Sequence, residues 1–450
     1  MTSEQNQPNM LDTAPVGKVF FKYLIPSLTG MMLMAVNIVA DGVMVGNRLG
    51  PVALAGVGIA SPVFTIFVAM SLWIGIGGAT LFSQEMGAKK PKHAQFIFTH
   101  SMALIAIFTI IIGLTSFIFQ EQLAYMLGAN EDTFPYTIGY LHVMLLFGFV
   151  FTIENALSTF VRNDQNPNLA MIALIITSLS NIGINYVFLY VLDLGVAAVA
   201  AGTIMASFLG VLVLAMHFFR KRNNLRFVSI KFHRSLFRNT MTVGFPSFLS
   251  EVGISVFTVA FNVTLARIAG TSGVAAFSVL NYVHGVMLMM FLGMASAVQP
   301  LVSYYHGAKM MERTRQTMKI ALGVAVMVGI LAFAIGQLAT REIVLIFGQF
   351  PDEVMEIAMT GIRLFFIAYL FMGINFVMMT YFQSVAQIRM ATWITASREI
   401  IFMMIFILVL PLFMGINGVW LSVPLAELVV LATIVVYVKR HREFRRALSG

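Results

Sequence analysis

The sequence contains no cysteine and few charged residues. Because Cys is absent from all 450 residues, the chain forms no disulfide bond and has no thiol for catalysis or metal binding. Asp, Glu, Lys and Arg make up only 10% of it, whereas a soluble domain has roughly 25%. This composition excludes a cytosolic enzyme. The 59% of hydrophobic residues instead match about twelve membrane spans of roughly 22 residues each.

Several motifs of enzymes and binding proteins are also missing. No Walker A sequence is present, and no HExxH motif or His cluster has the spacing of metal ligands. Since no nucleophile with a neighbouring base is evident either, we expect neither enzymatic activity nor a cofactor. The formal net charge of +9 does not indicate a nucleic-acid partner, because cytoplasmic loops of membrane proteins collect Lys and Arg.

Hydrophobic runs separated by short polar stretches predict an all-α membrane protein with twelve transmembrane helices. The first six spans lie near 18–46, 52–82, 94–118, 134–160, 168–190 and 195–219. The second six lie near 236–268, 274–304, 316–339, 354–384, 390–410 and 416–438. With both ends inside, 23 of the 28 Lys and Arg residues fall on the inner side, which predicts cytoplasmic N- and C-termini.

The two halves of the chain resemble each other at an offset of 220 or 221 residues. Ile25-Pro26-Ser27 corresponds to Phe245-Pro246-Ser247, and Gly87-Ala88-Lys89 corresponds to Gly307-Ala308-Lys309. Six spans per half make the repeats parallel, which is typical of two lobes in a secondary transporter. The predicted parts are a cytoplasmic N-terminal tail at 1–17, an N-lobe at 18–219, a basic cytoplasmic linker at 220–234, a C-lobe at 235–438 and a basic cytoplasmic tail at 439–450.

This plan resembles the multidrug and toxic compound extrusion (MATE) family, and within it the DinF-like or MepA-like branch. The resemblance rests on Pro26 and Asp41 in the first span, on the SQEMGAKK run after the second and on FVRNDQNPNLAM after the fourth. It implies a monomeric antiporter of the inner membrane. Such a protein exports small, cationic, amphipathic drugs by alternating access, coupled to inward flow of H⁺ or Na⁺.

The alternative function is a flippase of the same superfamily that moves a lipid-linked precursor. Such a protein would be expected to line its cavity with several Arg or Lys residues that bind pyrophosphate. The predicted cavity faces of this sequence are acidic and neutral, which favours cationic cargo.

Asp41 is the first candidate for ion coupling, because a charged side chain in hydrocarbon needs a cavity, a partner or a proton. Met34, Asn37 and Asp41 share one face of the first helix, so Met34 and Asn37 are candidate substrate contacts. Pro26 should kink this helix and act as a hinge between two shapes. The alternative is that Asp41 only forms a hydrogen bond near the outer helix end.

The resemblance pairs Asp41 with Asn181 and Asn185 of the fifth span, and Thr203 of the sixth span completes the candidate coupling site. Some relatives have Asp where this chain has Asn185. Because hard cations favour carboxylate oxygens, this difference weakens a Na⁺ site at Asp41, Asn181, Asn185 and Thr203. We therefore expect H⁺ rather than Na⁺ to be the coupling ion.

Further polar residues inside the spans are candidates for coupling or for substrate contact. Glu251 is the second coupling candidate, although the family branch that uses a Glu here also uses an Asp in the tenth span, which this chain lacks. Glu154 and Asn155 are candidate substrate contacts, and the repeat places Asn375 at the position equivalent to Glu154. Local hydrogen bonding is the alternative for all of them.

Four charged residues of the second half have no assigned function. Arg398 and Glu399 are consecutive, so we expect their side chains to point apart on a helix. Arg363 should pair with an acid that the sequence does not identify, and Glu427 is interpreted as structural. His284 lies within the eighth span and is an alternative candidate for a proton relay.

The chain is rich in methionine and phenylalanine, with 32 and 40 residues. Flexible Met side chains and aromatic rings suit adaptable pockets for organic cations. Most of them must face lipid or pack between helices. The further candidate substrate contacts are Phe64, Phe151, Met287 and Met379.

Overall fold

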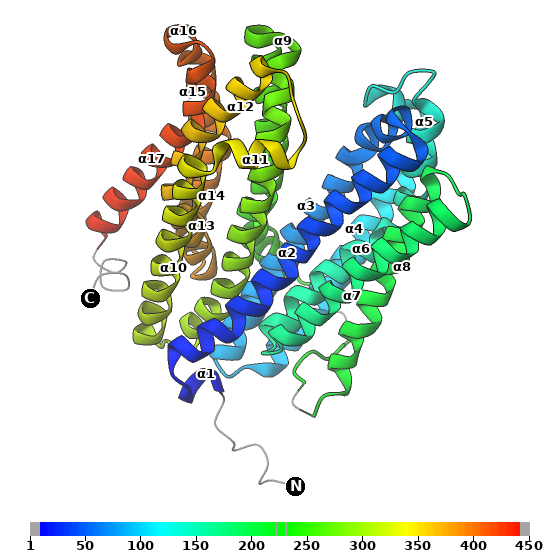
Figure 1. The fold of residues 1–450 in the computed structure, drawn as a ribbon. Helices are drawn as coiled ribbons and strands as arrows, with labels where there is room; N and C mark the ends of the chain where they lie inside the picture. The colour runs from blue at the N-terminus through cyan, green and yellow to red at the C-terminus, as the bar shows by residue number, and fades with distance from the viewer. Residues whose placement is uncertain (1–9, 222, 230–231, 442–450) are drawn as a thin grey trace. The chain divides into compact units, whose positions relative to one another are not determined.

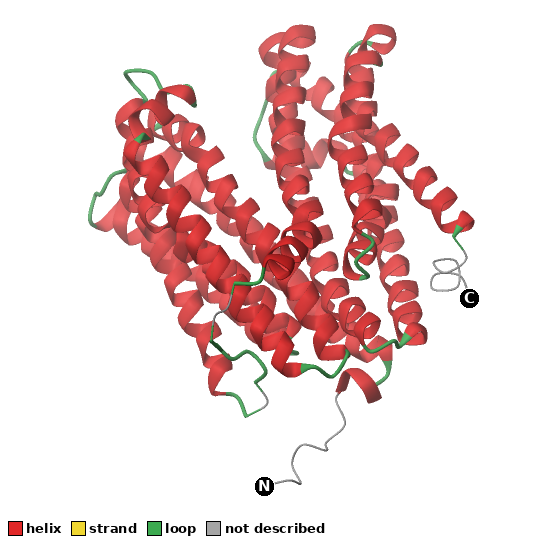
Figure 2. Ribbon diagram, turned by 180° about the vertical axis from the view of Figure 1, so that it is seen from behind, coloured by secondary structure: helices red, strands yellow, loops and turns green. Residues whose placement is uncertain are grey.

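The computed structural model describes residues 10–221, 223–229 and 232–441. All regular secondary structure in these ranges is helical (Figure 2). The predictions for residues 1–9 of the N-terminal tail, for 222 and 230–231 of the linker and for 442–450 of the C-terminal tail lie outside them.

The first half of the chain forms six long helices and two short ones. The long helices are α2 (Val16–Leu49), α3 (Pro51–Gly87), α4 (Pro91–Ile118), α6 (Phe134–Asn163), α7 (Pro167–Tyr186) and α8 (Val196–Ala215). The short ones are α1 (Met10–Thr13) and α5 (Gln120–Met126). A π-helical turn at Val187–Val191 continues α7, and a 3₁₀ turn at Met216–Phe219 continues α8.

The second half repeats this arrangement with more interruptions. Its helices are α9 (Arg234–Gly307), α10 (Met311–Leu338), α11 (Thr340–Ile346), α12 (Asp352–Phe365), α13 (Tyr369–Ser384), α14 (Ile388–Ala396), α15 (Phe402–Val409), α16 (Pro411–Met414) and α17 (Ile416–Arg440). A 3₁₀ turn at Phe366–Ala368 joins α12 to α13, and a π-helical turn at Ser397–Ile401 joins α14 to α15.

The described residues contain twelve segments that can cross a membrane, as the sequence predicted. Eleven helical segments are long and apolar enough, and one of these is the 74-residue α9. Gly270 divides α9, because its φ of 57° and ψ of −144° lie outside the helical region. The chain is therefore a multi-pass membrane protein.

The backbone confirms the internal repeat. The residues with positive φ recur in pairs 220 to 222 positions apart, and they are Gly50 and Gly270, Lys89 and Lys309, Gly128 and Gly348, Gln165 and Ala386, and Asp193 and Gly415. Positive φ is uncommon for a residue with a side chain. The same turns therefore connect the same helices in each half.

Two compact units make up the described chain. One unit is Pro26–Phe248, and the other comprises the described residues up to Ile25 and from Leu249 on. In the first unit α3 packs on α4 and α6, and α8 packs on α6 and α7 (Figure 1). In the second unit α13 packs on α10, α14 and α17.

The boundaries of these units differ from the ends of the predicted lobes. The start of α9 belongs to the first unit, where the indole Nε1 of Trp73 donates to the carbonyl oxygen of Met241 at 2.7 Å. Gly244 lies so close to the carbonyl of Trp73 that a Cβ would overlap it. The start of α2 belongs to the second unit, and Pro26 stands at the division inside this helix.

Candidate functional site

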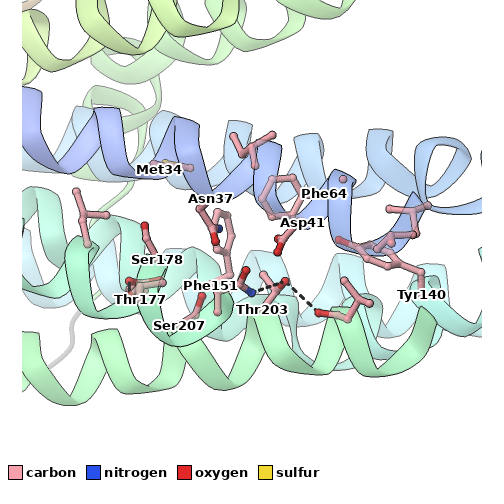
Figure 3. Close-up of a pocket in the computed structure, with 18 of the residues that line it drawn as sticks. Met34, Asn37, Asp41, Phe64, Tyr140, Phe151, Thr177, Ser178, Thr203 and Ser207 are labelled. Atoms are coloured by element: carbon pink, nitrogen blue, oxygen red, sulfur yellow. Dashed lines mark hydrogen bonds between the residues drawn. The ribbon is translucent and has the colours of Figure 1, made fainter. Parts of the chain in front are cut away.

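The unit Pro26–Phe248 encloses a cavity of about 250 Å³. Its walls come from α2, α3, α6, α7 and α8 (Figure 3). Nine residues that the sequence singled out line it, namely Met34, Asn37, Asp41, Phe64, Phe151, Glu154, Asn155, Asn181 and Thr203. The structure thus brings together most of the candidate residues from the first half, and what they bind stays a prediction.

Asp41 lies in a network of amide groups on one side of this cavity. Asn185 Nδ2 donates to Asp41 Oδ1 at 2.9 Å. The amide of Asn181 is best satisfied with its nitrogen towards Asp41, 2.9 Å from both carboxylate oxygens and from Asn37 Oδ1. Its oxygen then accepts from Thr203 Oγ1 at 3.1 Å. Figure 3 shows Asn37 and Asp41 projecting from α2 towards Thr203.

Asn185 is fully buried, in a position that depends on a glycine of the next helix. A Cβ at Gly202 of α8 would lie 2.0 Å from Asn185 Oδ1. The same amide oxygen has no hydrogen-bond partner. Gly202 therefore provides the space in which Asn185 reaches Asp41, a role that no sequence pattern revealed.

The C-terminal end of α2 is held against the segment after α7 by Arg48. Its Nε donates to the carbonyl oxygen of Leu189 at 3.0 Å, and its Nη2 forms an ion pair with Asp193 Oδ1 at 2.7 Å. Both partners belong to the segment after α7. Asp41 and Arg48 thus tie the part of α2 beyond Pro26 to α7 and its continuation.

Glu154 is the second acid of the cavity, and only 2% of it is exposed. Thr177 Oγ1 donates to its Oε1 at 2.5 Å. A Cβ at Gly210 would lie 2.2 Å from the same oxygen, so this glycine of α8 makes room for the carboxyl group. The cavity therefore holds two carboxyl groups from two different helices, α2 and α6.

Apolar side chains complete the cavity. The rings of Phe64 and Phe151 contact each other with centroids 4.8 Å apart and an interplanar angle of 44°. Tyr140, Thr177 and Ser207 also line the cavity, although the sequence did not single them out. Thr177 stands one turn before Asn181, and Ser207 one turn after Thr203, so helical spacing could have found both. No sequence signal marked Tyr140.

The remaining candidates lie in the other unit and are not among the residues that line this cavity. Glu251 and Met287 are half-buried on α9, and Met379 is buried on α13. Asn375 is fully buried, and its Nδ2 donates to Glu427 Oε2 at 2.7 Å and to the Glu427 carbonyl oxygen at 2.9 Å. Asn375 therefore takes part in a local hydrogen-bond network.

The prediction that Arg398 and Glu399 point apart is wrong. Arg398 Nη2 forms an ion pair with Glu399 Oε1 at 2.8 Å, and its Nε pairs with Glu427 Oε1 at 2.9 Å. Both residues lie in the π-helical turn Ser397–Ile401, whose wider spacing changes the side-chain directions that an α-helix would impose. Among the residues that the structure describes, no acid forms an ion pair with Arg363, whose Nε donates to Thr340 Oγ1 at 3.3 Å.

Comparisons with known proteins agree with this fold. The chain is 24% identical over 445 residues to the multidrug export protein MepA of Staphylococcus saprophyticus, covering 96% of each protein. It superposes with a TM-score of 0.89 on a MOP superfamily transporter from Pyrococcus furiosus, at 22% identity and covering 97% of this chain and 98% of that one.

A structure of a multidrug resistance MATE family transporter in an outward-facing conformation gives the same TM-score of 0.89, identity of 22% and coverage of 97% and 98%. The family model MatE matches residues 26–187 and 246–409, one segment in each half. Members of this family are transporters and not enzymes. The resemblance inferred from the sequence is confirmed, and the chain belongs to the MatE family.

Proposed function

We propose that this protein is an antiporter that exports cationic amphipathic compounds by alternating access and that H⁺ is its coupling ion. The observation that carries the proposal is the cavity of the unit Pro26–Phe248, in which two carboxyl groups stand among apolar and aromatic side chains. The multidrug export function of its relative MepA supports the same conclusion.

The lining of the cavity suits an organic cation. Glu154 and Asp41 attract positive charge, while Met34, Phe64 and Phe151 offer polarizable and aromatic surfaces. Its volume of about 250 Å³ is at the lower limit of roughly 300 Å³ for small-molecule pockets. A compact amphipathic cation is the cargo that matches this size and charge.

The same lining does not favour a lipid-linked precursor. None of the described residues that line the cavity is Lys or Arg. A pyrophosphate group needs such cations as partners. The alternative flippase function is therefore less consistent with this cavity than export of a cation.

The surroundings of Asp41 favour H⁺ over Na⁺. Asn181 and Asn185 direct N–H groups, and not oxygen atoms, at the carboxylate. A sodium ion would require oxygen atoms directed at it, and Asp41 supplies the one carboxylate of this amide network. A proton needs only the carboxyl group itself.

The mechanism follows from the two states of Asp41. The ionised carboxylate accepts hydrogen bonds from α7 and so holds α2 against it, together with Arg48. Protonation removes the charge that makes these bonds strong. The part of α2 beyond Pro26 can then bend, reshape the cavity and release the cargo. Proton and cargo thus favour opposite states, as antiport requires.

Topology and assembly complete the proposal. We place both termini in the cytoplasm of a cell with the protein in its inner membrane, because 23 of the 28 Lys and Arg residues then lie inside. The protein acts as a monomer, since one chain supplies both acids of the cavity.

The test is transport of a cationic dye in proteoliposomes with a proton or a sodium gradient imposed separately. We expect a proton gradient alone to drive transport in the wild type and to fail in Asp41→Asn. Glu121→Gln is the control, since Glu121 is an exposed acid of α5, and it should behave as the wild type. Transport driven by sodium alone, or unimpaired transport by Asp41→Asn, would refute the proposal.

A further inference from the structure

The connection between α8 and α9 carries positive charge without any acid. Residues 216–241 contain seven Lys and Arg residues and no Asp or Glu. The described part of the linker at 220–234 is a loop up to the start of α9 (Figure 2). Segments that are rich in one charge repel themselves and usually stay disordered. This linker differs, because contacts with the first unit hold it in place.

A buried carboxylate holds the start of the linker. Asp164 directly follows α6, and only 2% of it is exposed. Its Oδ1 accepts a hydrogen bond from Asn224 Nδ2, and its Oδ2 accepts one from the backbone N–H of Asn224, both at 2.8 Å. His217 Nε2, in the 3₁₀ turn after α8, lies 2.8 Å from the same Oδ2. Asp164 therefore binds the chain on both sides of the turn that leads from α8 into the linker.

The next residues of the linker also pack on the first unit. Leu225 is fully buried in a hydrophobic cluster with residues of α3, α4 and α6. Thr99 Oγ1 of α4 accepts a hydrogen bond from the backbone N–H of Val228 at 3.1 Å, and it lies 3.3 Å from the carbonyl oxygen of Arg226. The backbone of the linker is thus fixed on α4 and α6.

This fixed backbone presents cations and aromatic rings to the outside. Asn223 Nδ2 donates to the carbonyl oxygen of Phe218 at 3.2 Å, which brings the residues before and after the turn together. Two rings are far more exposed than is usual for Phe, at 89% for Phe219 and 63% for Phe227. The exposed side chains of this loop, which we call the linker surface, are Phe219, Arg220, Lys221, Arg226 and Phe227.

The cations of the linker surface lack acidic partners within the protein. Among the residues that the structure describes, no acid forms an ion pair with Arg220, Lys221 or Arg226. The carboxylate of Asp164 lies beneath the same loop, but it is buried and occupied by Asn224 and His217. The three cations are therefore available to negative groups of another molecule.

The linker surface begins where a membrane span ends. The helical segment Val196–Phe219 is long and apolar enough to cross a membrane, and Phe219 is its last residue. The headgroup layer of a bilayer lies at the ends of such spans, and aromatic rings beside basic residues are stabilised there. An aromatic ring exposed to water gains no such stabilisation. This position favours a lipid headgroup over a soluble partner.

We propose that the linker surface binds the headgroups of anionic phospholipids. Its three cations pair with phosphate oxygens, and its two phenyl rings enter the layer between the headgroups. Each Lys or Arg close to an anionic membrane surface contributes to such binding. Since the contacts with α4 and α6 already order the loop, binding does not have to fix its backbone.

This inference goes beyond the proposed transport function. It requires neither the coupling ion nor the cargo, and the linker surface shares no residue with the cavity. The proposed cytoplasmic position of the linker decides only which leaflet supplies the lipid. A variant that has lost lipid binding can therefore still transport, and a variant that has lost transport can still bind lipid.

The test is native mass spectrometry of the purified full-length protein in detergent, titrated with phosphatidylglycerol or with phosphatidylcholine. We expect the wild type to bind its first phosphatidylglycerol more tightly than phosphatidylcholine. Arg220→Gln combined with Arg226→Gln should weaken binding of phosphatidylglycerol by about 25-fold, or about fivefold for each cation removed, and leave phosphatidylcholine unchanged. Phe219→Ser should weaken both lipids, because its ring does not distinguish the charge of the headgroup.

The matched control is Arg267→Gln combined with Arg341→Gln, which removes two exposed arginines of the second unit and should bind both lipids as the wild type does. Asn224→Ala keeps every cation but loses its side-chain contact with Asp164, so it should also weaken binding of phosphatidylglycerol.

Three results would overturn the proposal. The first is equal affinity of the wild type for the two lipids, and the second is unchanged binding of phosphatidylglycerol by the linker double variant or by Asn224→Ala. The third is displacement of phosphatidylglycerol by inorganic phosphate alone, which would show that the linker surface binds free anions and not a membrane.

Discussion

Gly202 offers a way to disturb the Asp41 site without removing any of its polar groups. A methyl group at this position would lie 2.0 Å from Asn185 Oδ1 and 3.1 Å from its Cγ. Contacts this short do not occur, and the nearest atoms belong to the Asn185 side chain. We predict that Gly202→Ala displaces this amide and breaks its 2.9 Å hydrogen bond to Asp41.

The size of the effect follows from the charge on the acceptor. A hydrogen bond to a charged group contributes about 1.5–3 kcal/mol. Since a tenfold change in an equilibrium constant corresponds to about 1.4 kcal/mol, the balance between ionised and protonated Asp41 should shift by about one to two orders of magnitude towards the protonated form. The site should then release its proton only at higher pH.

The assay is dye efflux from proteoliposomes as a function of the pH on the side where the proton is released. We expect the half-maximal pH of Gly202→Ala to move upwards by about one to two units relative to the wild type, following the energy above. The matched control is Gly183→Ala on the neighbouring helix α7, where a Cβ would meet nothing within 4 Å. Identical pH profiles for the two alanine variants would refute the proposed role of Asn185.

Three other changes test different parts of the structure. Glu154→Gln removes one of the two cavity carboxyl groups, so the KM for a cationic dye should rise about tenfold or more while a neutral substrate is unaffected, as kinetics in proteoliposomes would show. Arg398→Leu leaves two buried acids without their partner and should lower the free energy of unfolding by about 3–5 kcal/mol. Arg48→Ala breaks an exposed pair and should lower the free energy of unfolding by at most about 1 kcal/mol, as the same thermal unfolding series would show. Gly244→Ala would place a methyl group 1.6 Å from the carbonyl oxygen of Trp73, so it should lower the free energy of unfolding by about 1–3 kcal/mol or more. An unchanged unfolding temperature would contradict the close packing described for these helices.

Much of the fold could be predicted because membrane spans leave strong local signals. A run of about 20 apolar residues is long enough to cross the bilayer, and prolines at the first turn mark the starts of α3, α4, α6 and α7. The short helices α5 and α11 were not predicted. Each has only seven residues, which is too few for a periodic pattern.

Contacts between segments that are far apart in the chain could not be predicted from the sequence. The start of α9 joins the first unit because Gly244 packs on the backbone of Trp73, and backbone contacts of this kind have no periodic signature. The pairing of Arg398 with Glu399 was missed for a related reason. Helical geometry was assumed, and nothing in the five residues Ser397–Ile401 indicates a π-helical turn.

The candidate site was easier to locate than to complete. Asp41 stood out because an acid in an apolar span requires an explanation, and the resemblance then supplied Asn181 and Asn185. Gly202 and Gly210 were not found. Their contribution is the absence of a side chain next to a polar group, which only the packed structure reveals.

The repeat explains why the frame of this protein is more predictable than its chemistry. Positive-φ turns recur in both halves, because a turn with the wrong backbone geometry would misplace every helix that follows it. The side chains inside each half can differ without misplacing the helices. Asp41 corresponds to Phe261 at an offset of 220 and Asn185 to Phe406 at an offset of 221, so the second half lacks the amide-bound acid of the first. Conversely, Thr177 is replaced by Arg398. Two halves with one backbone plan thus place their ionisable groups at different positions, Asp41 and Glu154 in one and Glu251, Arg398, Glu399 and Glu427 in the other.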